Sequence, residues 1–278
     1  MTTAGALLRE ATAQLRAAGI ASSRVDAELL LAHCLGVERA RLSLVDAVPS
    51  GVESAFGAAV ARRAWREPLQ HIVGLAPFRH VQLAVGPGVF VPRPETELLV
   101  DAVLPTLRAA SAPVFVDLCA GSGALAIAVT DEVPGARGYA VERCGRALDW
   151  LRRNTVGTSV EVVSADIRDP DLLRSLRATV DVVLCTPPYV PAALRVEPEV
   201  RADPVEAVFA GPDGLELMPA VIARAAELLR PGGVAAIEHD DSHGALLPRL
   251  LAERGGWCGI RAHRDLAGQP RYVTAVRC

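Results

Sequence analysis

The spacing of apolar residues changes twice along the chain and divides it into three stretches. From residue 1 to about residue 70, apolar residues recur at helical spacing, as in SSRVDAELLLAHCLG, where serines precede the apolar positions and Gly36 follows them. The segment SGVESAFGAAVARRAW repeats the pattern. The sequence therefore predicts a helical domain over residues 1–70.

Residues 71–92 switch to short β-like runs that glycine and proline interrupt. The segment HIVGLAPFRHVQLAVGPGVFVP contains two such runs, and its turn residues lie between and after them. This stretch is predicted to be a β-hairpin linker between two domains.

Residues 93–278 alternate β-branched runs with helical patterns. The runs are VFVD (114–117), GYAVE (138–142), VEVVSAD (160–166), VDVVLC (180–185) and GVAAIEH (233–239). Such alternation predicts an α/β domain whose parallel sheet is covered by helices on both faces. The last runs, CGIRAHRDL and RYVTAVR, are joined by a short turn and should pair antiparallel at the sheet edge.

Composition and charge exclude several classes of function. Apolar residues make up 51% of the chain and the net charge is −3, so neither disorder nor non-specific nucleic-acid binding is expected. Every basic residue is arginine, which excludes lysine chemistry. The spacing of Arg62, Arg63 and Arg66 is interpreted as the solvated face of a helix.

The cysteines and histidines do not predict a metal site. The six cysteines form no C-x-x-C pair, and His71, His80, His239 and His243 share no ligand spacing, so surface or capping roles are expected for these histidines. Neither a signal peptide nor about 18 continuous apolar residues occurs. A cytoplasmic protein without membrane association is expected.

A glycine-rich turn follows the first strand of the α/β region. In VDLCAGSGALAIA, Gly121 and Gly123 permit a tight turn and close approach of a ligand to the backbone, and the next helix offers its positive N-terminus. The same spacing fits a dinucleotide-binding fingerprint.

Four strands of this region end on polar residues. Asp117, Glu142, Asp166 and Thr186 should converge on one crevice, because ligands in open α/β sheets bind beyond the carboxyl ends of the strands. Glu142 could accept both hydroxyls of a ribose. Asp166 is equally consistent with recognition of an adenine or amine and with capping of the following turn.

The turn Thr186-Pro187-Pro188-Tyr189 ends a buried strand. Its prolines donate no backbone hydrogen bond, so the turn presents carbonyl oxygens, the Thr186 hydroxyl and an aromatic ring. These groups can hold a flat NH₂-bearing substrate and increase electron density on its nitrogen as it attacks an electrophilic methyl group. The alternative is a rigid turn that only leaves the sheet.

With these motifs, the sequence resembles the protein-(glutamine-N5) methyltransferases that modify peptide-chain release factors. The resemblance runs through EPLQHIVGLAPFRHVQLAVGPGVFVPRPETELLV, VDLCAGSGALAIAV, YAVERC, SADIRD, CTPPYVP, DPVEAVFAGPDGLELM, LLRPGGVAAIEH and HRDLAGQPRYVTAVR. It implies a Rossmann-like class I methyltransferase fold with a seven-stranded mixed sheet, S-adenosylmethionine as cofactor, and a helical domain that docks the release factor.

The resemblance also assigns roles to individual residues. Residues predicted to bind the cofactor are Asp117, Cys119, Ala120, Gly121, Ser122, Gly123, Glu142, Asp166, Ile167 and Thr186. Phe90, Arg93 and Glu97 are predicted to help close the substrate site. Thr186, Pro187, Pro188 and Tyr189 are the predicted catalytic residues and would hold the glutamine of a Gly-Gly-Gln loop.

Thr186 departs from the family, which has asparagine at this position. Asparagine offers an amide oxygen and an NH₂ group, whereas threonine offers one shorter hydroxyl. This change leaves room for another NH₂-bearing substrate, either a small molecule or the exocyclic amine of a nucleobase.

Two readings outside this chemistry remain. One is a scaffold that binds the cofactor or a release factor without turnover, and the other is a nicotinamide-dependent oxidoreductase. A nucleobase substrate would require a target-recognition domain and a basic channel, and neither is visible in the sequence.

Overall fold

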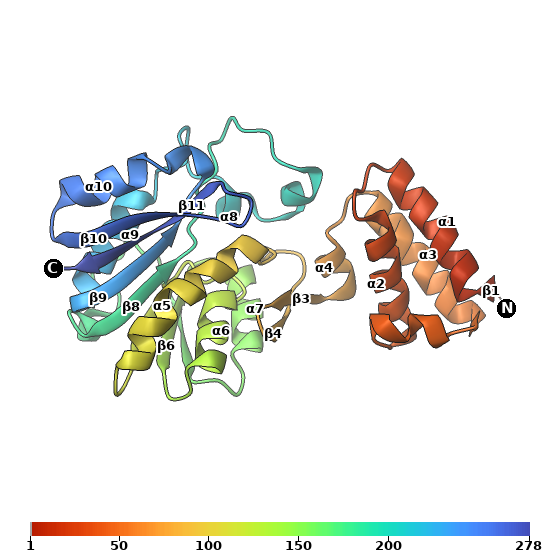
Figure 1. The fold of residues 1–278 in the computed structure, drawn as a ribbon, viewed down its shortest axis with the longest axis horizontal. Helices are drawn as coiled ribbons and strands as arrows, with labels where there is room; N and C mark the ends of the chain where they lie inside the picture. The colour runs from red at the N-terminus through yellow and green to blue at the C-terminus, as the bar shows by residue number, and fades with distance from the viewer. Residues whose placement is uncertain (1) are drawn as a thin grey trace. The chain divides into compact units, whose positions relative to one another are not determined.

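The computed structural model of the protein describes residues 2–278, which form two compact units (Figure 1). Among the described residues, one unit comprises residues 2–75 and Val196–Ala202, and the other comprises Ala76–Arg195 and Asp203–Cys278. Of residues 71–92, predicted as a β-hairpin linker, 71–75 lie in the first unit and 76–92 in the second. Residues 71–73 belong to a helix, Leu69–Val73, so the β-like part is shorter than predicted.

The first unit is helical. Its elements are β1 (Thr2–Thr3), α1 (Ala4–Ala17), α2 (Ser23–Leu35), η1 (Arg39–Leu44), β2 (Ala47–Val48), α3 (Ser50–Ala64), α4 (Leu69–Val73) and the separate η4 (Pro198–Ala202). Leu15, Leu30 and Phe56 belong to its buried core. Gly36 adopts φ +67° directly after α2, which explains why the helix ends there.

The predicted solvated helix face holds for Arg62, which is exposed on α3, but was wrong for Arg63. Its side chain is 8% exposed and donates to Asp26 over 2.7 Å and to Glu199 over 2.9 Å. Glu199 also accepts from Arg66 over 2.7 Å. These ion pairs attach residues 196–202 to α2 and α3, a long-range contact that helical spacing does not reveal.

The second unit is built on a seven-stranded mixed sheet, which confirms the predicted fold class. Its strands are β5 (Val114–Leu118), β6 (Arg137–Glu142), β7 (Val160–Ser164), β8 (Val180–Cys185), β9 (Leu229–Glu238), β10 (Trp257–Arg264) and β11 (Pro270–Arg277), in the order β10-β11-β9-β8-β5-β6-β7. Five neighbouring strands, β9, β8, β5, β6 and β7, are parallel to one another. As predicted, β10 and β11 pair antiparallel at one edge.

Two hydrophobic cores cover the two faces of this sheet. Helices α5 (Glu97–Ala109), α6 (Ala124–Glu132) and α7 (Gly145–Asn154) contribute to one core, while α9 (Met218–Leu228) and α10 (Leu246–Arg254) contribute to the other (Figure 1). Neighbouring residues of β5 alternate between them, Phe115 in the first and Val116 in the second. This alternation follows from the two-residue period of a strand.

The remaining elements of the second unit are short. They are the hairpin β3 (Leu75–Phe78) and β4 (Val81–Ala84), η2 (Pro94–Thr96), η3 (Arg174–Leu176), α8 (Val205–Val208) and η5 (Asp241–His243). Asn154 links the hairpin to the glycine-rich turn, because its side chain bonds both backbone groups of Ala84 and the carbonyl oxygen of Ser122.

Surface or capping roles were expected for the histidines, and the surface alternative is wrong for three of them. His71, His239 and His243 are buried. The ring of His243 donates through Nε2 to the carbonyl oxygen of Asp213 over 2.8 Å, and His239 donates through Nδ1 to that of Asp240 over 2.8 Å. Such carbonyl partners allow an imidazole to be buried at the end of an element.

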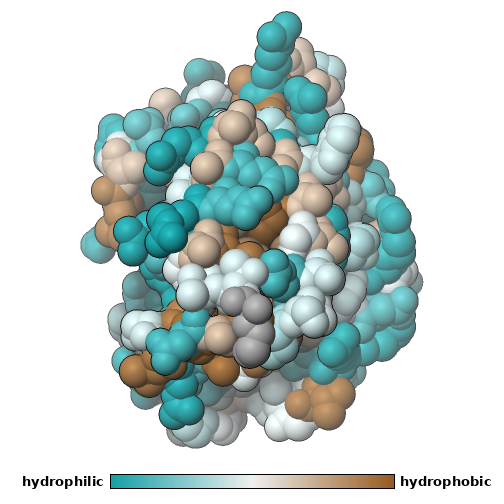
Figure 2. Space-filling model, turned by 90° about the vertical axis from the view of Figure 1, so that its right-hand side faces the viewer, coloured by the Kyte–Doolittle hydropathy of each residue, from teal (hydrophilic) through white to brown (hydrophobic). Residues whose placement is uncertain are grey.

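The surface of the helical unit is mixed. Figure 2 shows mainly hydrophilic residues on one face, with hydrophobic residues in separate patches. Leu44 and Trp65 are the most exposed large hydrophobic residues described in this unit, at 79% and 88%. Among residues 2–278, no helix combines the length and apolar character needed to cross a membrane.

Candidate functional site

The glycine-rich turn joins β5 to α6 through left-handed backbone conformations. Cys119, Gly121 and Gly123 have φ values of +64°, +55° and +87°. A Cβ atom on Gly123 would lie 2.7 Å from Leu151, so this glycine is required for close packing. No atom lies within 4 Å of the corresponding position at Gly121, which leaves open space for a ligand against the backbone.

Asp117 lies in β5 just before this turn. Its side chain is 1% exposed, and neither carboxylate oxygen has a hydrogen-bond partner among the described residues. Burial raises the pKa of Asp117 to about 8; the backbone NH of Ala126 opposes this shift, and the Glu142 charge adds a smaller upward effect. A buried carboxyl group without a partner is suited to a cationic ligand group, which would supply the missing charge.

Glu142 connects the end of β6 to the turn. Its Oε2 accepts from the backbone NH of Gly121 over 3.0 Å, and its Oε1 accepts from those of Arg143 and Cys144 over 2.8 and 2.7 Å. Three donors fix the carboxylate, and Oε2 retains one free lone pair for a further donor. Ala120 is held in the same place, because its NH donates to the Val141 carbonyl oxygen.

Asp166 is engaged within its own turn. Its carboxylate accepts from the backbone NH and guanidinium of Arg168 and from Arg143. These bonds, with that of the Arg168 side chain the largest cause, hold the pKa of Asp166 well below its usual range. The carboxylate thus orders the turn that includes Ile167, whose side chain is buried in the core.

The Thr186-Pro187-Pro188-Tyr189 turn leaves the carboxyl end of β8. The prolines are buried, and the Thr186 hydroxyl oxygen is buried without a hydrogen-bond partner among the described residues. After the turn, the Val190 NH donates to the Val208 carbonyl, and the Ala210 NH donates to the Val190 carbonyl, over 3.0 and 3.1 Å. Residues 208–214 therefore form a strap that fixes the backbone of the turn.

Glycine is required where this strap passes Tyr189. Gly214 has φ +77°, and a Cβ atom there would lie 2.2 Å from the Tyr189 carbonyl oxygen. The strap can reach the turn only because no side chain stands between the two backbones.

Glu238 is a site residue that the sequence analysis missed. It ends β9, is fully buried, and accepts a hydrogen bond over 2.7 Å from the Tyr189 hydroxyl through Oε1. Its Oε2 has no hydrogen-bond partner among the described residues. The strand-end argument applied to Asp117 and Glu142 could have found it, because Glu238 is the next-to-last residue of the run GVAAIEH.

Phe90 and Arg93 form one group, and Glu97 belongs to another. The Arg93 guanidinium lies 4.7 Å from the centre of the Phe90 ring and pairs with Asp203 over 2.6 Å. Burial raises the pKa of Asp203 to about 6 although the Arg93 charge opposes this. Glu97 instead accepts from the backbone NH of Arg79 in the β3–β4 turn over 2.9 Å.

Strand register brings the principal predicted residues to one edge. Leu118 of β5 pairs with Cys185 of β8, and Cys185 pairs with Ile237 of β9. The glycine-rich turn after β5, Thr186 after β8 and Glu238 at the end of β9 therefore lie side by side. They occupy the carboxyl edge, where α/β sheets bind ligands.

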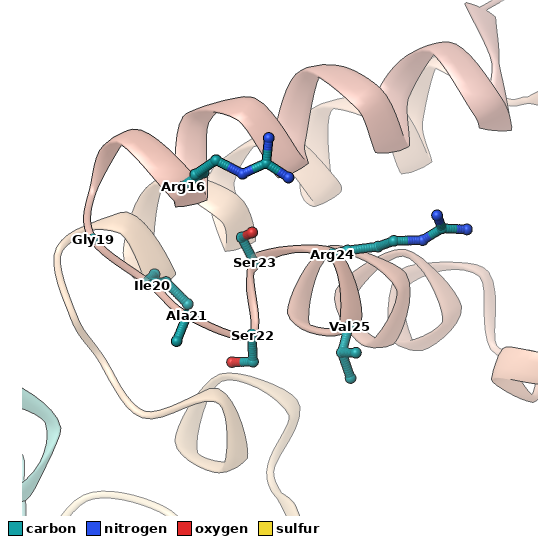
Figure 3. Close-up of a pocket in the computed structure, with 8 residues that line it drawn as sticks. All are labelled: Arg16, Gly19, Ile20, Ala21, Ser22, Ser23, Arg24 and Val25. Atoms are coloured by element: carbon teal, nitrogen blue, oxygen red, sulfur yellow. The ribbon is translucent and has the colours of Figure 1, made fainter.

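A separate pocket of about 420 Å³ lies in the helical unit (Figure 3). Its lining residues are Arg16, Gly19, Ile20, Ala21, Ser22, Ser23, Arg24 and Val25. None of the predicted site residues is among them, and it is not part of this site.

The carboxyl-edge residues fit S-adenosylmethionine, which carries an ammonium group, a ribose and a reactive methyl group. Asp117 offers an unpaired carboxylate to the ammonium, Gly121 leaves room at the backbone, and Glu142 keeps one acceptor for a ribose hydroxyl. No group of three or more potential metal ligands occurs among residues 2–278.

Family comparisons cover both units of the chain. Residues 6–74 match the PrmC N-terminal domain, and residues 81–203 match the methyltransferase small domain. The catalytic domain of hMettl16, solved in complex with MAT2A 3'UTR hairpin 6, is similar in fold, with a TM-score of 0.57 and 17% identity over 79% of this chain and 81% of that chain.

Two curated relatives extend over nearly the whole chain. A release factor glutamine methyltransferase of Mycolicibacterium smegmatis is 48% identical over 100% of this chain and 99% of its own length. A 4-amino-L-phenylalanine/4-methylamino-L-phenylalanine methyltransferase of Streptomyces pristinaespiralis is 41% identical over 90% of this chain and 87% of its own length.

Three observations support the same assignment. They are the glycine-rich turn beside an unpaired carboxylate, the proline-proline-aromatic turn on the adjacent strand, and the full-length similarity to known methyltransferases. The protein is an S-adenosylmethionine-dependent methyltransferase and belongs to the release factor glutamine methyltransferase family.

Proposed function

We propose that this protein methylates the side-chain amide nitrogen of the glutamine in the Gly-Gly-Gln loop of peptide-chain release factors. The observation that carries the proposal is the unpartnered Thr186 hydroxyl oxygen, buried at the end of β8 beside the strand that bears Asp117. Nearly full-length similarity to release factor glutamine methyltransferases supports the substrate.

The residues of the cofactor side would bind and orient the methyl donor. S-adenosylmethionine supplies an electrophilic methyl group when it is bound. Asp117 would hold its ammonium, residues 119–123 would surround its methionine part, and Glu142 would accept from its ribose. The adenine contacts predicted for Asp166 and Ile167 remain part of the proposal, with Asp166 acting through the turn that it orders.

The residues of the substrate side would hold the carboxamide. The Thr186 hydroxyl oxygen and the proline carbonyl oxygens would accept from its NH₂ group, and the Tyr189 ring would lie against its plane. Accepting these hydrogen bonds places negative charge next to a nitrogen that becomes positive as the new bond forms. Phe90, Arg93 and Glu97 would complete the substrate side.

The proposal extends to the partner and its compartment. The helices of the first unit, matched by the PrmC N-terminal domain, would dock the release factor, and the reaction would take place in the cytoplasm. The net charge of −3 agrees with a protein partner and gives no support to nucleic acid or anionic membrane as the direct substrate.

A second candidate substrate is a small aromatic amine. Two observations favour it: threonine replaces the asparagine of the family at position 186, and a relative 41% identical is named for methylation of 4-amino-L-phenylalanine. A planar NH₂-bearing ring could use the same acceptors and the same Tyr189 face.

The test is methyl transfer by the purified protein with S-adenosylmethionine and each candidate. The release factors of its own organism are digested after the reaction, and the Gly-Gly-Gln peptide is examined by mass spectrometry. A single added methyl on the glutamine supports the proposal, and a release factor with glutamate in place of that glutamine serves as control. Transfer to 4-amino-L-phenylalanine alone would select the second candidate.

A further inference from the structure

Glu238 is buried in a position that core packing does not explain. It is fully buried at the end of β9. Its Oε1 accepts from the Tyr189 hydroxyl over 2.7 Å, and its Oε2 has no hydrogen-bond partner among the described residues, although the Thr96 hydroxyl is close enough to lower the pKa of Glu238. Leaving a buried polar atom unsatisfied destabilises the folded state, and a charged atom does so more strongly. A hydrophobic residue would avoid this cost at a position that serves packing alone.

Strand register places Glu238 beside Thr186. Because Cys185 pairs with Ile237 in parallel strands, the next residues, Thr186 and Glu238, are neighbours on strands about 4.8 Å apart. The hydrogen bond to Tyr189 shows that the Glu238 side chain turns toward the Thr186–Tyr189 turn.

Tyr189 is consequently fixed from two directions. Gly214 of the strap packs against its backbone carbonyl, and Glu238 accepts a hydrogen bond from its hydroxyl. Since the hydroxyl is engaged, the part of Tyr189 left for a substrate is the face of its ring.

We propose that Glu238 is a positioning residue for methyl transfer, which acts by holding the Tyr189 ring against the planar NH₂-bearing group of the substrate. The inference rests on the proposed function and applies equally to a carboxamide and to an aromatic amine. Fixing the ring keeps the NH₂ group aligned with the Thr186 hydroxyl, and misplacement by about 1 Å can cost about 100-fold in rate.

The surroundings of Glu238 contain both signs of charge. Burial raises its pKa, and the Glu95 carboxylate adds to this, whereas the hydroxyls of Tyr189 and Thr96 and the Arg271 guanidinium lower it. Arg271 is itself paired with Asp265 over 3.0 Å. The ionised form of Glu238, which is the stronger acceptor for the Tyr189 hydroxyl, is therefore favoured as pH rises.

The test is a double-mutant cycle on the full-length protein with Tyr189→Phe, Glu238→Ala and the combined variant. The values of kcat and KM are measured with whichever substrate the wild type methylates. We expect each single change to lower kcat between about 10- and 100-fold, and the combined variant to be no slower than the slower single variant. The affinity for S-adenosylmethionine, measured by calorimetry, should stay unchanged.

The conservative variant Glu238→Gln separates positioning from a structural role. It keeps an acceptor oxygen for the Tyr189 hydroxyl, so it should recover most of the kcat lost in Glu238→Ala. Glu253→Gln, on the exposed pair with Arg249, is the matched control and should resemble the wild type.

The outcomes distinguish this inference from the proposed function. Wild-type kcat in Tyr189→Phe, or losses that multiply in the combined variant, would overturn the positioning role while leaving the proposed function intact. A wild type that binds S-adenosylmethionine but methylates neither the release factor nor the amine would overturn the proposed function, and this inference with it. If Glu238→Ala fails to fold, Tyr189→Phe and Glu238→Gln, each compared with the wild type, still decide the question.

Discussion

A threonine hydroxyl and an asparagine amide present different groups to a substrate NH₂. The Thr186 hydroxyl oxygen is buried without a partner among the described residues, so its capacity to accept a hydrogen bond is unused. The threonine side chain is shorter than the asparagine that the family has at this position, so its oxygen reaches less far. A longer or poorly aimed hydrogen bond stabilises a transition state less well. The choice between a release factor and a small amine therefore depends strongly on this one side chain.

Thr186→Asn should increase the rate of methyl transfer to the Gly-Gly-Gln loop by about tenfold or more, because it restores an amide oxygen at the acceptor position. Thr186→Val, which keeps the shape but removes the hydroxyl, should lower the rate with any substrate that uses this acceptor. Initial rates from mass spectrometry of the glutamine peptide measure both changes. An unchanged rate in Thr186→Asn would show that the threonine does not limit the reaction.

Asp117 should make cofactor binding depend on pH. Its pKa of about 8 lies above its ordinary value of 3.8, so the free protein holds a proton there below about pH 8. Binding an ammonium group favours the carboxylate and releases that proton. The affinity for S-adenosylmethionine should therefore rise as pH increases toward about 8, with the release of about one proton at lower pH.

Calorimetry in buffers with different ionisation heats measures this proton release. Asp117→Asn should bind the cofactor more weakly and lose the pH dependence, whereas the exposed Asp131→Asn should keep both. The free energy of unfolding depends on pH in the opposite direction. Protonated Asp117 favours the folded state at acidic pH, and this contribution is lost as pH rises through about 8. A cofactor affinity that is flat between about pH 6 and 8 in the wild type would contradict the assignment.

At the scale of elements, the strap of residues 208–214 determines the conformation of the substrate turn. It bonds Val190 on both backbone groups and passes Tyr189 at Gly214, where no side chain fits. The rigidity of the turn thus comes from a segment that follows it in sequence, in addition to the two prolines.

Gly214→Ala should displace the strap or the Tyr189 carbonyl and lower kcat by about tenfold or more, with a loss of stability of about 1–3 kcal/mol from the strained conformation alone. Gly135→Ala is the matched control, because Gly135 also has positive φ, +89°, but no atom lies within 4 Å of its Cβ position. Both variants should lose stability, and only Gly214→Ala should lose activity beyond that. Equal activity in the two variants would show that the strap does not control the turn.

Local patterns predicted the elements better than they predicted the contacts between distant elements. The β-branched runs located β5, β6, β8 and β9, because burial on both faces selects such residues along much of a strand. The run VEVVSAD also located β7, although this edge strand has no buried residue. The same patterns missed the burial of Arg63, since its partner Glu199 lies 136 residues away. Glu238 was missed because its partner Tyr189 is 49 residues away, and because the strand-end argument was applied to Asp117, Glu142, Asp166 and Thr186 but not to the run GVAAIEH.

At the scale of the whole molecule, a buried ion cluster attaches residues 196–202 to the helical unit. Arg63 and Asp26 are 8% and 6% exposed at their side chains, and Glu199 completes the cluster. Removing one member of a buried pair leaves an uncompensated charge and costs about 3–5 kcal/mol, far more than removal of a surface pair.

Arg63→Met should therefore destabilise the helical unit by about 3–5 kcal/mol. Arg62→Met is the matched control on the same helix, where the Arg62 side chain is 49% exposed and pairs with Glu67, and it should cost about 0–1 kcal/mol. Hydrogen exchange of the α2 and α3 amides reports the stability of this unit separately from that of the sheet. Similar exchange rates in the two variants would show that the cluster contributes little.

The attachment of residues 196–202 also determines which fragments of the chain contain the complete first unit. A fragment that stops at Leu75 contains every helix of the first unit up to α4 but lacks Glu199, the shared partner of Arg63 and Arg66. Expressed alone, such a fragment carries two arginines whose acidic partner is encoded more than a hundred codons downstream. A synthetic peptide that spans residues 196–202 should bind this fragment and raise its melting temperature, in the manner of a complemented split protein.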